Sequence, residues 1–403
     1  MYQMSQNVVD ADHESLQNFI SDSKWNAQAV MDQVAQQVDK QIGDPAETAL
    51  IIDESGIAKK GEKSVGVARQ WLGSIGKVDN GQVGVFAALC KGSDAALIDA
   101  RLYLPKEWTD DPERCEGAGV PREHMAFQTK DEIALGMIKR ARKNGMRFGW
   151  VGADAGYGKG LTFMKELHSM GEMFMVDVHS DCHIFLQEPK PYLPTKAPGS
   201  RGRSATRYVV DEKPVRVDAW VKRQPQSAWK KQSIREGTKG TLQYEVLTRH
   251  IWLWEQDTNI CHHWHLVIRR DPETKSDLKF SCCNAPKNTD RLRLARMQAQ
   301  RYWIERTFED AKSECGMADY EVRGWDGWHH HMALVLMAQS FLLDERILNR
   351  AEIPLLSCAD LVELLSAALP AKIKSVDDVA KAMEQRHRKR KAAIESAFRC
   401  QST

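Results

Sequence analysis

The sequence predicts an α/β protein in which helices flank a mixed β-sheet. From residue 48 onward, short apolar runs typical of buried strands alternate with longer amphipathic segments that favour helices. The Pro-, Gly- and Arg-rich stretch 187–215 interrupts this alternation, and β-type segments follow it up to residue 284. Both ends of the chain show only helical patterns. These three observations predict one α/β core with a β-rich insertion.

Composition places the chain among globular proteins. Of its 403 residues 42% are hydrophobic and 28% are charged, which is enough for a large core. The net charge is only +2 at pH 7, so overall charge does not by itself indicate a nucleic-acid partner. No apolar run is long enough to span a bilayer, and the N-terminus lacks a signal-peptide pattern. Nine scattered cysteines favour free thiols in a reducing cytoplasm.

The predicted organisation has five parts. They are an N-terminal helical segment (1–46), the first part of the core (47–186), a β-rich insertion (187–284), the second part of the core with a long helix (285–345), and a C-terminal helical segment (346–403).

The elements of the first half follow from local patterns. Residues 21–42 begin with capping residues and keep apolar side chains near one side, so we expect a helix. TALIIDESG (48–56) predicts a buried strand, with antiparallel neighbours at 82–90 and 96–105. Helices at 131–145 and 161–171 and strands ending near Asp154 and in 172–181 complete the expected core.

The second half begins with the insertion. Four β-type segments are expected, at 215–223, 240–254, 262–270 and 279–284. For any single tryptophan in this part, the more probable interpretation is a place in the core. The five tryptophans are Trp220, Trp229, Trp252, Trp254 and Trp264. Helices are then predicted at 291–315, at 324–343 and towards the C-terminus, where the last one carries the basic run 386–391.

The predicted helix 291–315 combines an apolar stripe with a charged border. Arg301, Glu305 and Lys312 fall within a narrow arc beside that stripe, because their spacings are four and seven residues. A carboxylate between two cations suits metal and phosphate chemistry. Taken alone, however, an ion pair of this spacing is common on solvated helices and contributes little.

Two aspartates follow predicted strands directly. Asp53 ends ALIID and Asp154 ends FGWVGAD, and small residues come soon after both. Strand ends form the open sheet edge at which α/β proteins place their sites, although capping a turn is an equally common role for Asp. Together with Glu305, these side chains offer the oxygen ligands that Mg²⁺ prefers.

The three motifs in order resemble the DDE-type transposases of bacterial insertion sequences. IIDESG, GADAGYG and RYWIERTFEDAK carry the resemblance, which extends from about residue 45 to 345. It is to the cut-and-paste branch, whose last acid lies in a Y-x2-R-x3-E-x6-K signature, with Arg301, Glu305 and Lys312 at R, E and K. Gln298 stands at the Tyr position, a departure for which Tyr302 could substitute from another face.

The resemblance implies a ribonuclease H-like fold and a metal-dependent reaction. Asp53, Asp154 and Glu305 would hold two Mg²⁺ ions, with Mn²⁺ as a possible substitute. Water would cut one strand at the transposon end, and the freed 3′-hydroxyl would attack the opposite strand or target DNA. Arg301 and Lys312 would contact phosphates, and Arg323 is a further candidate. A homodimer on double-stranded DNA in the bacterial cytoplasm, associated with the nucleoid, is also implied.

Several interpretations remain open from the sequence. A stand-alone Mg²⁺-dependent nuclease of the same fold and a non-cleaving DNA-binding derivative are the alternatives to a transposase. Glu309 is the runner-up for the last acid, and the three histidines at 329–331 are expected on a helix surface. The resemblance further implies that 1–46 is a shortened end-recognition region, and the runs 222–231 and 386–391 are candidate phosphate contacts.

Overall fold

A computed structural model describes residues 8–9, 11–195, 205–237, 240–370 and 375–401. The chain divides into two compact units. One comprises Trp25–Cys358 and contains the whole predicted core. The other combines Met1–Lys24 with Ala359–Thr403. Part of the expected loop in 187–215 (196–204) and the first seven residues of the predicted N-terminal segment lie outside the described residues.

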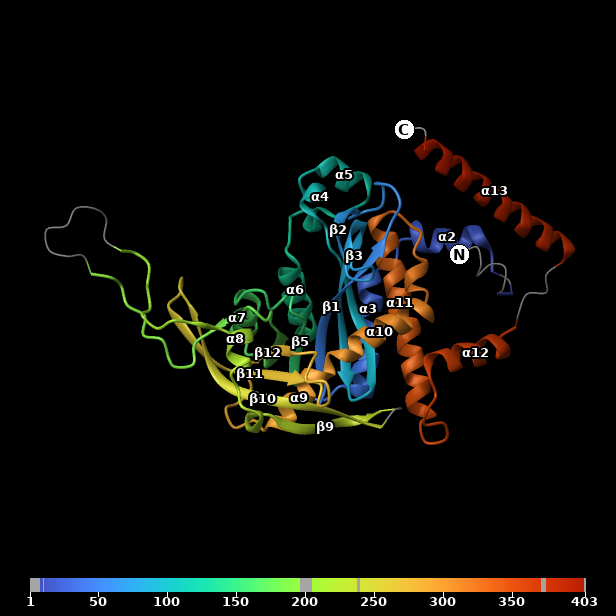
Figure 1. The fold of residues 1–403 in the computed structure, drawn as a ribbon. Coiled ribbons are helices and arrows are strands. Elements are labelled where there is room, and N and C mark those ends of the chain that lie inside the picture. The colour runs from blue at the N-terminus through green and yellow to red at the C-terminus, as the bar shows by residue number, and fades with distance from the viewer. Residues whose placement is uncertain (1–7, 10, 196–204, 238–239, 371–374, 402–403) are drawn as a thin grey trace. The chain divides into compact units, whose positions relative to one another are not determined.

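A ten-stranded mixed sheet forms the centre of the larger unit (Figure 1). Its order is β2-β3-β1-β5-β6-β12-β11-β10-β9, and β4 pairs with β3. β1, β5 and β6 are parallel to one another, and the remaining pairs are antiparallel. The predicted α/β class with a mixed sheet is confirmed. The strands are β1 (Ala49–Ala58), β2 (Ala68–Leu72), β3 (Lys77–Lys91), β4 (Asp94–Leu102), β5 (Trp150–Ala153), β6 (Phe174–Asp177), β9 (Lys230–Gly237), β10 (Gly240–Glu255), β11 (Ile260–Arg270) and β12 (Lys279–Cys283).

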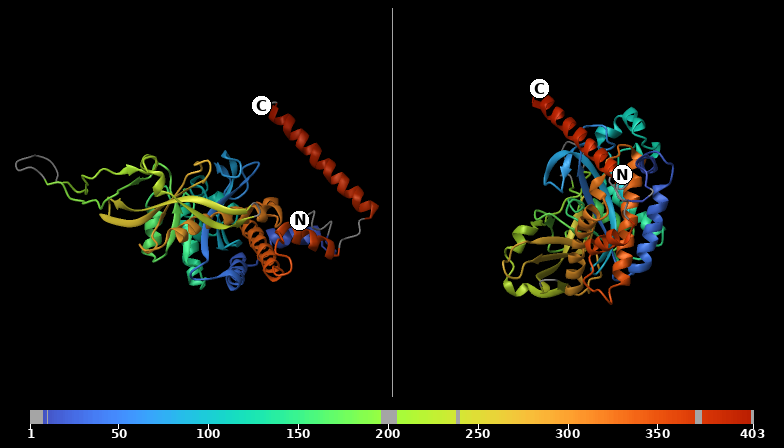
Figure 2. Two further views of the ribbon diagram at one scale, coloured as in Figure 1. Left: turned by 60° about the horizontal axis from the view of Figure 1, so that its bottom comes forward. Right: turned by 90° about the vertical axis from the view of Figure 1, so that its right-hand side faces the viewer.

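Helices flank this sheet and fill the connections. Those of the larger unit are α3 (Ala27–Ile42), α4 (Lys106–Thr109), α5 (Pro112–Gly117), α6 (Lys130–Lys143), α7 (Thr162–Ser169), α8 (Val217–Val221), α9 (Arg291–Gln300), α10 (Tyr302–Ser313) and α11 (Trp325–Leu348). Short 3₁₀ turns lie at Arg122–His124, Gln226–Ala228 and Met317–Asp319, and β7 (His183–Ile184) pairs with β8 (Val215–Arg216). Figure 2 shows α3 and α11 side by side, in agreement with their contacts.

The smaller unit contributes only helices among its described residues. They are α2 (His13–Ser21), α13 (Val376–Gln401) and α12 (Cys358–Ala368), of which Cys358 belongs to the larger unit. The helix predicted for the basic run 386–391 is confirmed, because that run lies within α13. In the described part of the chain, no helix has both the length and the apolar character that a bilayer-spanning segment needs.

The insertion extends the central sheet instead of forming a sheet of its own. β12 pairs with β6, and β11, β10 and β9 follow in order, as Figure 1 shows. The strands predicted at 240–254, 262–270 and 279–284 are confirmed. The strand predicted at 215–223 is wrong, because Val217–Val221 forms α8. Both ends of α8 are buried valines spaced four residues apart, which one helical turn places on the same side.

Packing against β3 fixes the helix that bears Glu305. Phe308 of α10 meets Phe86 edge-to-face with 5.3 Å between ring centroids, and Trp328 of α11 lies 6.3 Å from the same ring. Ile304 and Ala311 are fully buried beside Phe308. The predicted apolar stripe is therefore the face that holds α10 on the sheet, and Glu305 lies at its border.

The single helix predicted for 291–315 is divided into two. α9 ends at Gln300 and α10 begins at Tyr302, so that only Arg301 separates them. Arg301 keeps helical dihedral angles (φ −56°, ψ −30°), and the Ile304 amide bonds to its carbonyl at 3.2 Å, one residue short of the α-helical spacing. The break is therefore a local tightening at the residue that carries the guanidinium of the predicted site.

The expected surface position of the three histidines on α11 is wrong. His329 and His330 are buried, and His331 is half-buried with its Nε2 3.0 Å from the Gly316 carbonyl oxygen. The His330 ring stacks on Trp25 with 3.9 Å between centroids. Burial lowers the pKa of His329 to about 3. The first turn of α11 lies inside the unit because α3 packs over it.

Candidate active site

The register of three parallel strands aligns three aspartates at one edge of the sheet. Ile52 of β1 pairs with Ala153 of β5, and Ala153 pairs with Val176 of β6. The next residue on each strand is an aspartate: Asp53, Asp154 and Asp177. In-register residues of parallel strands point to the same side, so the three carboxylates form a row. We call Asp53, Asp154 and Asp177 the aspartate row.

Asp53 differs slightly from its predicted position. The sequence indicates a strand end, but β1 continues to Ala58 because its antiparallel pairing with β3 extends beyond the parallel pairing with β5. The parallel part does stop at Ile52, so Asp53 still lies at the open edge. Asp154 follows the last residue of β5, and its Oδ1 accepts a hydrogen bond from the Gly156 amide at 2.9 Å. The turn predicted after it is confirmed.

Glu305 reaches the aspartate row through Arg301. The Arg301 Nη2 atom lies 2.9 Å from Glu305 Oε1, and Nη1 lies 3.4 Å from Asp53 Oδ2. A third contact joins Arg301 Nε to Asp177 Oδ2 at 3.1 Å. The guanidinium side chain is only 20% exposed, so this is a shielded ion-pair network and not a solvated surface pair. Arg301 is thus shielded, whereas its i,i+4 partner Glu305 keeps 51% of its side chain exposed.

The electrostatics of Asp53 reflect the convergence of the acids. Burial and the charge of Asp154 raise the pKa of Asp53 to about 7, Glu305 adds to the increase, and Arg301 opposes it. These effects require the three predicted acids to lie near one another. Positions 53, 154 and 305 are thus brought together, although they are far apart in the chain.

The two other predicted phosphate contacts differ. The Lys312 ammonium is half-buried 5.7 Å from the centroid of the Phe308 ring, and the charge of Asp53 acts on it, while burial lowers its pKa. Among the acids of the aspartate row, Asp53 is the one whose charge acts on Lys312. Arg323 is exposed before α11, where its carbonyl oxygen accepts from the Val65 amide at 2.9 Å. Arg323 lies outside the ion-pair network around Arg301.

Comparisons with known proteins decide the family. Residues 1–241 match the family described as DDE superfamily endonuclease. The matched stretch includes Asp53 and Asp154 and ends before Glu305. The chain belongs to the DDE superfamily of endonucleases. It is also 25% identical over 321 residues to the probable transposase for insertion sequence element IS701 from Microchaete diplosiphon, which covers 78% of this chain and 70% of that protein.

The donor set of this DDE endonuclease fits a hard divalent cation. Burial and the charges of Asp154 and Glu305 raise the pKa of Asp53, and a bound cation would offset the repulsion among these carboxylates. As placed, however, no three acid, histidine or cysteine side chains among the described residues are arranged to ligate one ion. The Arg301 guanidinium contacts two of the three acids instead.

Asp177 is the site residue that sequence reasoning missed in this DDE endonuclease. Its strand was predicted within 172–181, but its carboxylate was not considered part of the site. A signal was available, since FMVD ends a buried apolar run with an acid just as ALIID and WVGAD do. The Ser281 hydroxyl donates to Asp177 Oδ1, and Arg301 binds the other oxygen.

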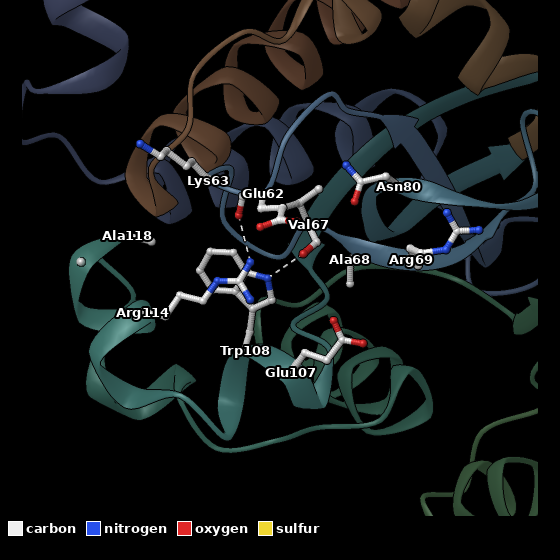
Figure 3. Close-up of a pocket in the computed structure, with 11 residues that line it drawn as sticks. Glu62, Lys63, Val67, Ala68, Arg69, Asn80, Glu107, Trp108, Arg114 and Ala118 are labelled. Carbon is white, nitrogen blue, oxygen red and sulfur yellow. Dashed lines mark hydrogen bonds between the residues drawn. The ribbon is translucent and has the colours of Figure 1, made fainter. Parts of the chain in front are cut away.

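A separate pocket of about 660 Å³ lies near β2, α4 and α5 (Figure 3). There the Arg114 guanidinium lies over the Trp108 ring at 3.9 Å and donates to the Glu62 carbonyl oxygen. Trp108 Nε1 donates to the Val67 carbonyl oxygen at 2.8 Å. These polar groups are already paired, and the residues lining this pocket include none of the acids of the aspartate row. This pocket is therefore separate from the candidate site at the aspartate row.

Proposed function

We propose that this protein is a transposase that cleaves DNA at transposon ends and joins the freed end to target DNA. The observation that carries the proposal is the convergence of Asp53 and Asp154, aligned by strand register, with Glu305 on a helix from the other half of the chain. Membership of the DDE superfamily and the likeness to a probable transposase support it.

Asp53, Asp154 and Glu305 would hold two Mg²⁺ ions, or Mn²⁺ in their place. Such ions supply an activated attacking oxygen and stabilise the leaving oxygen of a phosphodiester. The carboxylates orient these cations from the rigid sheet edge and from α10. Lys312 of α10, on which the charge of Asp53 acts, would hold a non-bridging phosphate oxygen and stabilise the negative charge that develops there.

The DNA contacts of the proposal come from the insertion and from basic segments. Lys222, Arg223, Lys230 and Lys231 are exposed, and they would bind phosphates of double-stranded DNA. Trp229 and Trp264 are buried, so base stacking in the insertion would fall to Trp220, Trp252 or Trp254, which are half-buried. A homodimer would bring two transposon ends together. DNA affinity that stayed constant with added salt would contradict the phosphate contacts.

The test is cleavage of DNA that carries the ends flanking the gene, with Mg²⁺ and with Mn²⁺. We expect Asp53→Asn, Asp154→Asn and Glu305→Gln each to reduce cleavage at least about 100-fold, because each removes a cation ligand. Glu309→Gln is the matched control, since Glu309 lies one turn further along α10 and pairs with Arg306 at 3.0 Å. Full cleavage by Glu305→Gln together with loss in Glu309→Gln would overturn the assignment of Glu305.

A pre-cut transposon end separates a transposase from a stand-alone nuclease. The proposed transposase should join the free 3′-hydroxyl of such an end to a second DNA molecule, and the same three substitutions should abolish the joined product. Cleavage without any joining of pre-cut ends would favour the nuclease. DNA binding without cleavage or joining would favour a non-cleaving derivative.

A further inference from the structure

We propose that Asp177 is a positioning residue, which holds the Arg301 guanidinium beside Asp53 and Glu305. There Arg301 balances the catalytic carboxylates until divalent cations replace it. The inference rests on the proposed function, because it assigns the cations to Asp53, Asp154 and Glu305. It adds an acid outside that triad and a second role for Arg301.

The geometry divides the guanidinium among three carboxylates. Nε binds Asp177 at 3.1 Å, Nη2 binds Glu305 at 2.9 Å, and Nη1 lies 3.4 Å from Asp53. Asp177 and Asp53 are equally shielded, each with 15% of the side chain exposed, whereas Glu305 is 51% exposed. Arg301 is thus held between the half-buried Asp53 and Asp177 on the sheet and the more exposed Glu305 of α10.

Asp177 is held by a chain of two side-chain hydrogen bonds, whereas Asp53 Oδ1 accepts from the Glu54 amide at 2.7 Å and Asp154 Oδ1 accepts from the Gly156 amide at 2.9 Å. Gln298 Nε2 donates to the Ser281 hydroxyl at 2.7 Å, and that hydroxyl donates to Asp177 Oδ1. The backbone adds a further constraint, because Ser281 and Asp177 are paired across β12 and β6. Asp177 Oδ1 therefore accepts from the Ser281 hydroxyl, and Oδ2 binds Arg301. Ser281 and Gln298 therefore fix the Asp177 carboxylate in the position from which it binds Arg301.

The charges explain why an anchor is needed. Without metal ions, Arg301 is the positive charge that contacts both Asp53 and Glu305, at 3.4 Å and 2.9 Å. When cations bind Asp53 and Glu305, Arg301 must leave those two oxygens. Its contact with Asp177 uses a different nitrogen and is shorter than its contact with Asp53, so it can persist. Arg301 then stays near the reacting phosphate without competing for the cation ligands.

The first test is a double-mutant cycle on the metal-free protein, read by chemical denaturation. Asp177→Asn should lower stability when Arg301 is present, because Arg301 loses an ion-pair partner. In the Arg301→Met background the same change should have no effect or increase stability, because it removes an unbalanced carboxylate. We expect a coupling of about fivefold or more in the unfolding constant. Additive effects of the two substitutions would overturn the proposal.

The second test measures Mn²⁺ affinity by calorimetry without DNA. Arg301→Met should bind Mn²⁺ more tightly than the unmodified protein, because a competing cation is gone. Asp177→Asn should bind several-fold more weakly, because Arg301 is then left to Asp53 and Glu305, and this loss should shrink in the Arg301→Met background. A loss of equal size in both backgrounds would mean that Asp177 acts by its charge alone.

Glu54→Gln is the matched control for that charge. Glu54 is half-buried next to Asp53, is paired with Lys130, and has no contact with Arg301 among the ion pairs of the described residues. It should weaken Mn²⁺ binding less than Asp177→Asn does, and an equal effect would count against a role through Arg301. If Asp53→Asn leaves Mn²⁺ binding unchanged, the proposed metal site fails, whereas the metal-free cycle still tests the pairing of Asp177 with Arg301.

Discussion

At the scale of single residues, neighbours decide what each charged side chain can do. Arg301 matches the R of a family signature in which it would bind phosphate, yet here its nitrogens are engaged by Asp53, Asp177 and Glu305. Three carboxylates and one guanidinium in a shielded space make protonation, cation binding and stability interdependent. The pH response of the metal-free protein should therefore report on this network.

The pKa of Asp53 predicts the sign of that response. The folded protein raises it from its usual 3.8 to about 7, so the folded state binds the proton more tightly than the unfolded chain. The contribution of Asp53 to the stability of the metal-free protein should therefore fall as pH rises from about 4 to about 7. Asp53→Asn cannot ionise, so its stability relative to the unmodified protein should increase over that window, by up to about 4 kcal/mol. Denaturant melts at several pH values measure this difference.

Asp79→Asn is the control for the pH experiment. Asp79 pairs with Lys77 at 2.9 Å, and hydrogen bonds from Lys77 and the Asn80 amide lower its pKa. Its contribution to stability is present above the usual value and is lost as pH falls towards its folded pKa. The difference between Asp79→Asn and the unmodified protein should therefore stay flat between pH 4 and 7. A flat profile for Asp53→Asn as well would contradict the burial of Asp53 among acids.

At the scale of elements, the turn after β5 and the last turn of α9 support the aspartate row from two sides. A Cβ built on Gly158 would lie 1.8 Å from the Asp177 carbonyl oxygen, so this turn contacts the end of β6 directly. From the other side, Gln298 of α9 is 3% exposed, and its amide binds Ser281. Substitutions in either element should therefore change the position of Asp177.

Gly158→Ala should displace the backbone at Asp177. Since the clash is with backbone and not with a flexible side chain, we expect a loss of about 1–3 kcal/mol in stability and a marked loss of cleavage. Gly160→Ala is the matched control, because a Cβ there meets no atom within 4 Å. Thermal melts and cleavage rates of both variants provide the measurement. Equal behaviour of the two would show that the close approach at Gly158 is unimportant.

Gln298→Ala tests what replaces the signature tyrosine. Because Gln298 is buried and bonded to Ser281, its loss should lower stability by about 1–3 kcal/mol and leave DNA affinity unchanged under stabilising conditions. Gln300→Ala, at a half-buried position whose amide bonds to the Gly92 carbonyl oxygen, should cost less. A selective loss of DNA affinity in Gln298→Ala would instead indicate a direct contact with DNA.

Local patterns predict most elements of this fold, but not the contacts that depend on tertiary packing. Apolar runs were sufficient for β1, β3, β4, β10, β11 and β12, whereas β9 had no such signal; the helical spacing of apolar residues indicated α10, the terminal acid and glycine indicated α6, and a largely apolar run indicated α11. The single-residue break at Arg301 has no local signal, because no Pro or Gly accompanies it. The burial of His329 and His330 depends on α3, which is distant in sequence.

The candidate site shows the same limit. Strand ends and helix spacing indicated Asp53, Asp154 and Glu305 only together with the family resemblance, because each local pattern alone also fits a turn cap or a helix-surface ion pair. The ion pairs of Arg301 could not be predicted, since they depend on the pairing of β5 with β6 and of β6 with β12. That pairing turns Asp177 from a strand-end acid into part of the network.

At the scale of the whole molecule, cation binding should stabilise the folded protein by mass action. A ligand that binds only the folded state adds about 2.7 kcal/mol at 100 times its dissociation constant. Mn²⁺ should therefore raise the melting temperature, with a larger effect above pH 7, where the pKa of Asp53 no longer favours protonation. Asp154→Asn should abolish the increase, whereas Asp79→Asn should retain it. An equal increase in Asp154→Asn would place the cation elsewhere.

The alignment of the aspartate row depends on the alternation of side chains along each strand. Successive side chains of a strand point to opposite faces, and each residue advances the chain by about 3.3 Å. One residue inserted into β5 before Asp154 would turn that carboxylate to the wrong face with almost no change in composition, and two would restore the face but move it about 7 Å away. Connections between strands carry no such constraint. An insertion in a loop leaves the alternation of side chains along the strands unchanged, whereas an insertion within β1, β5 or β6 would displace an aspartate of the row.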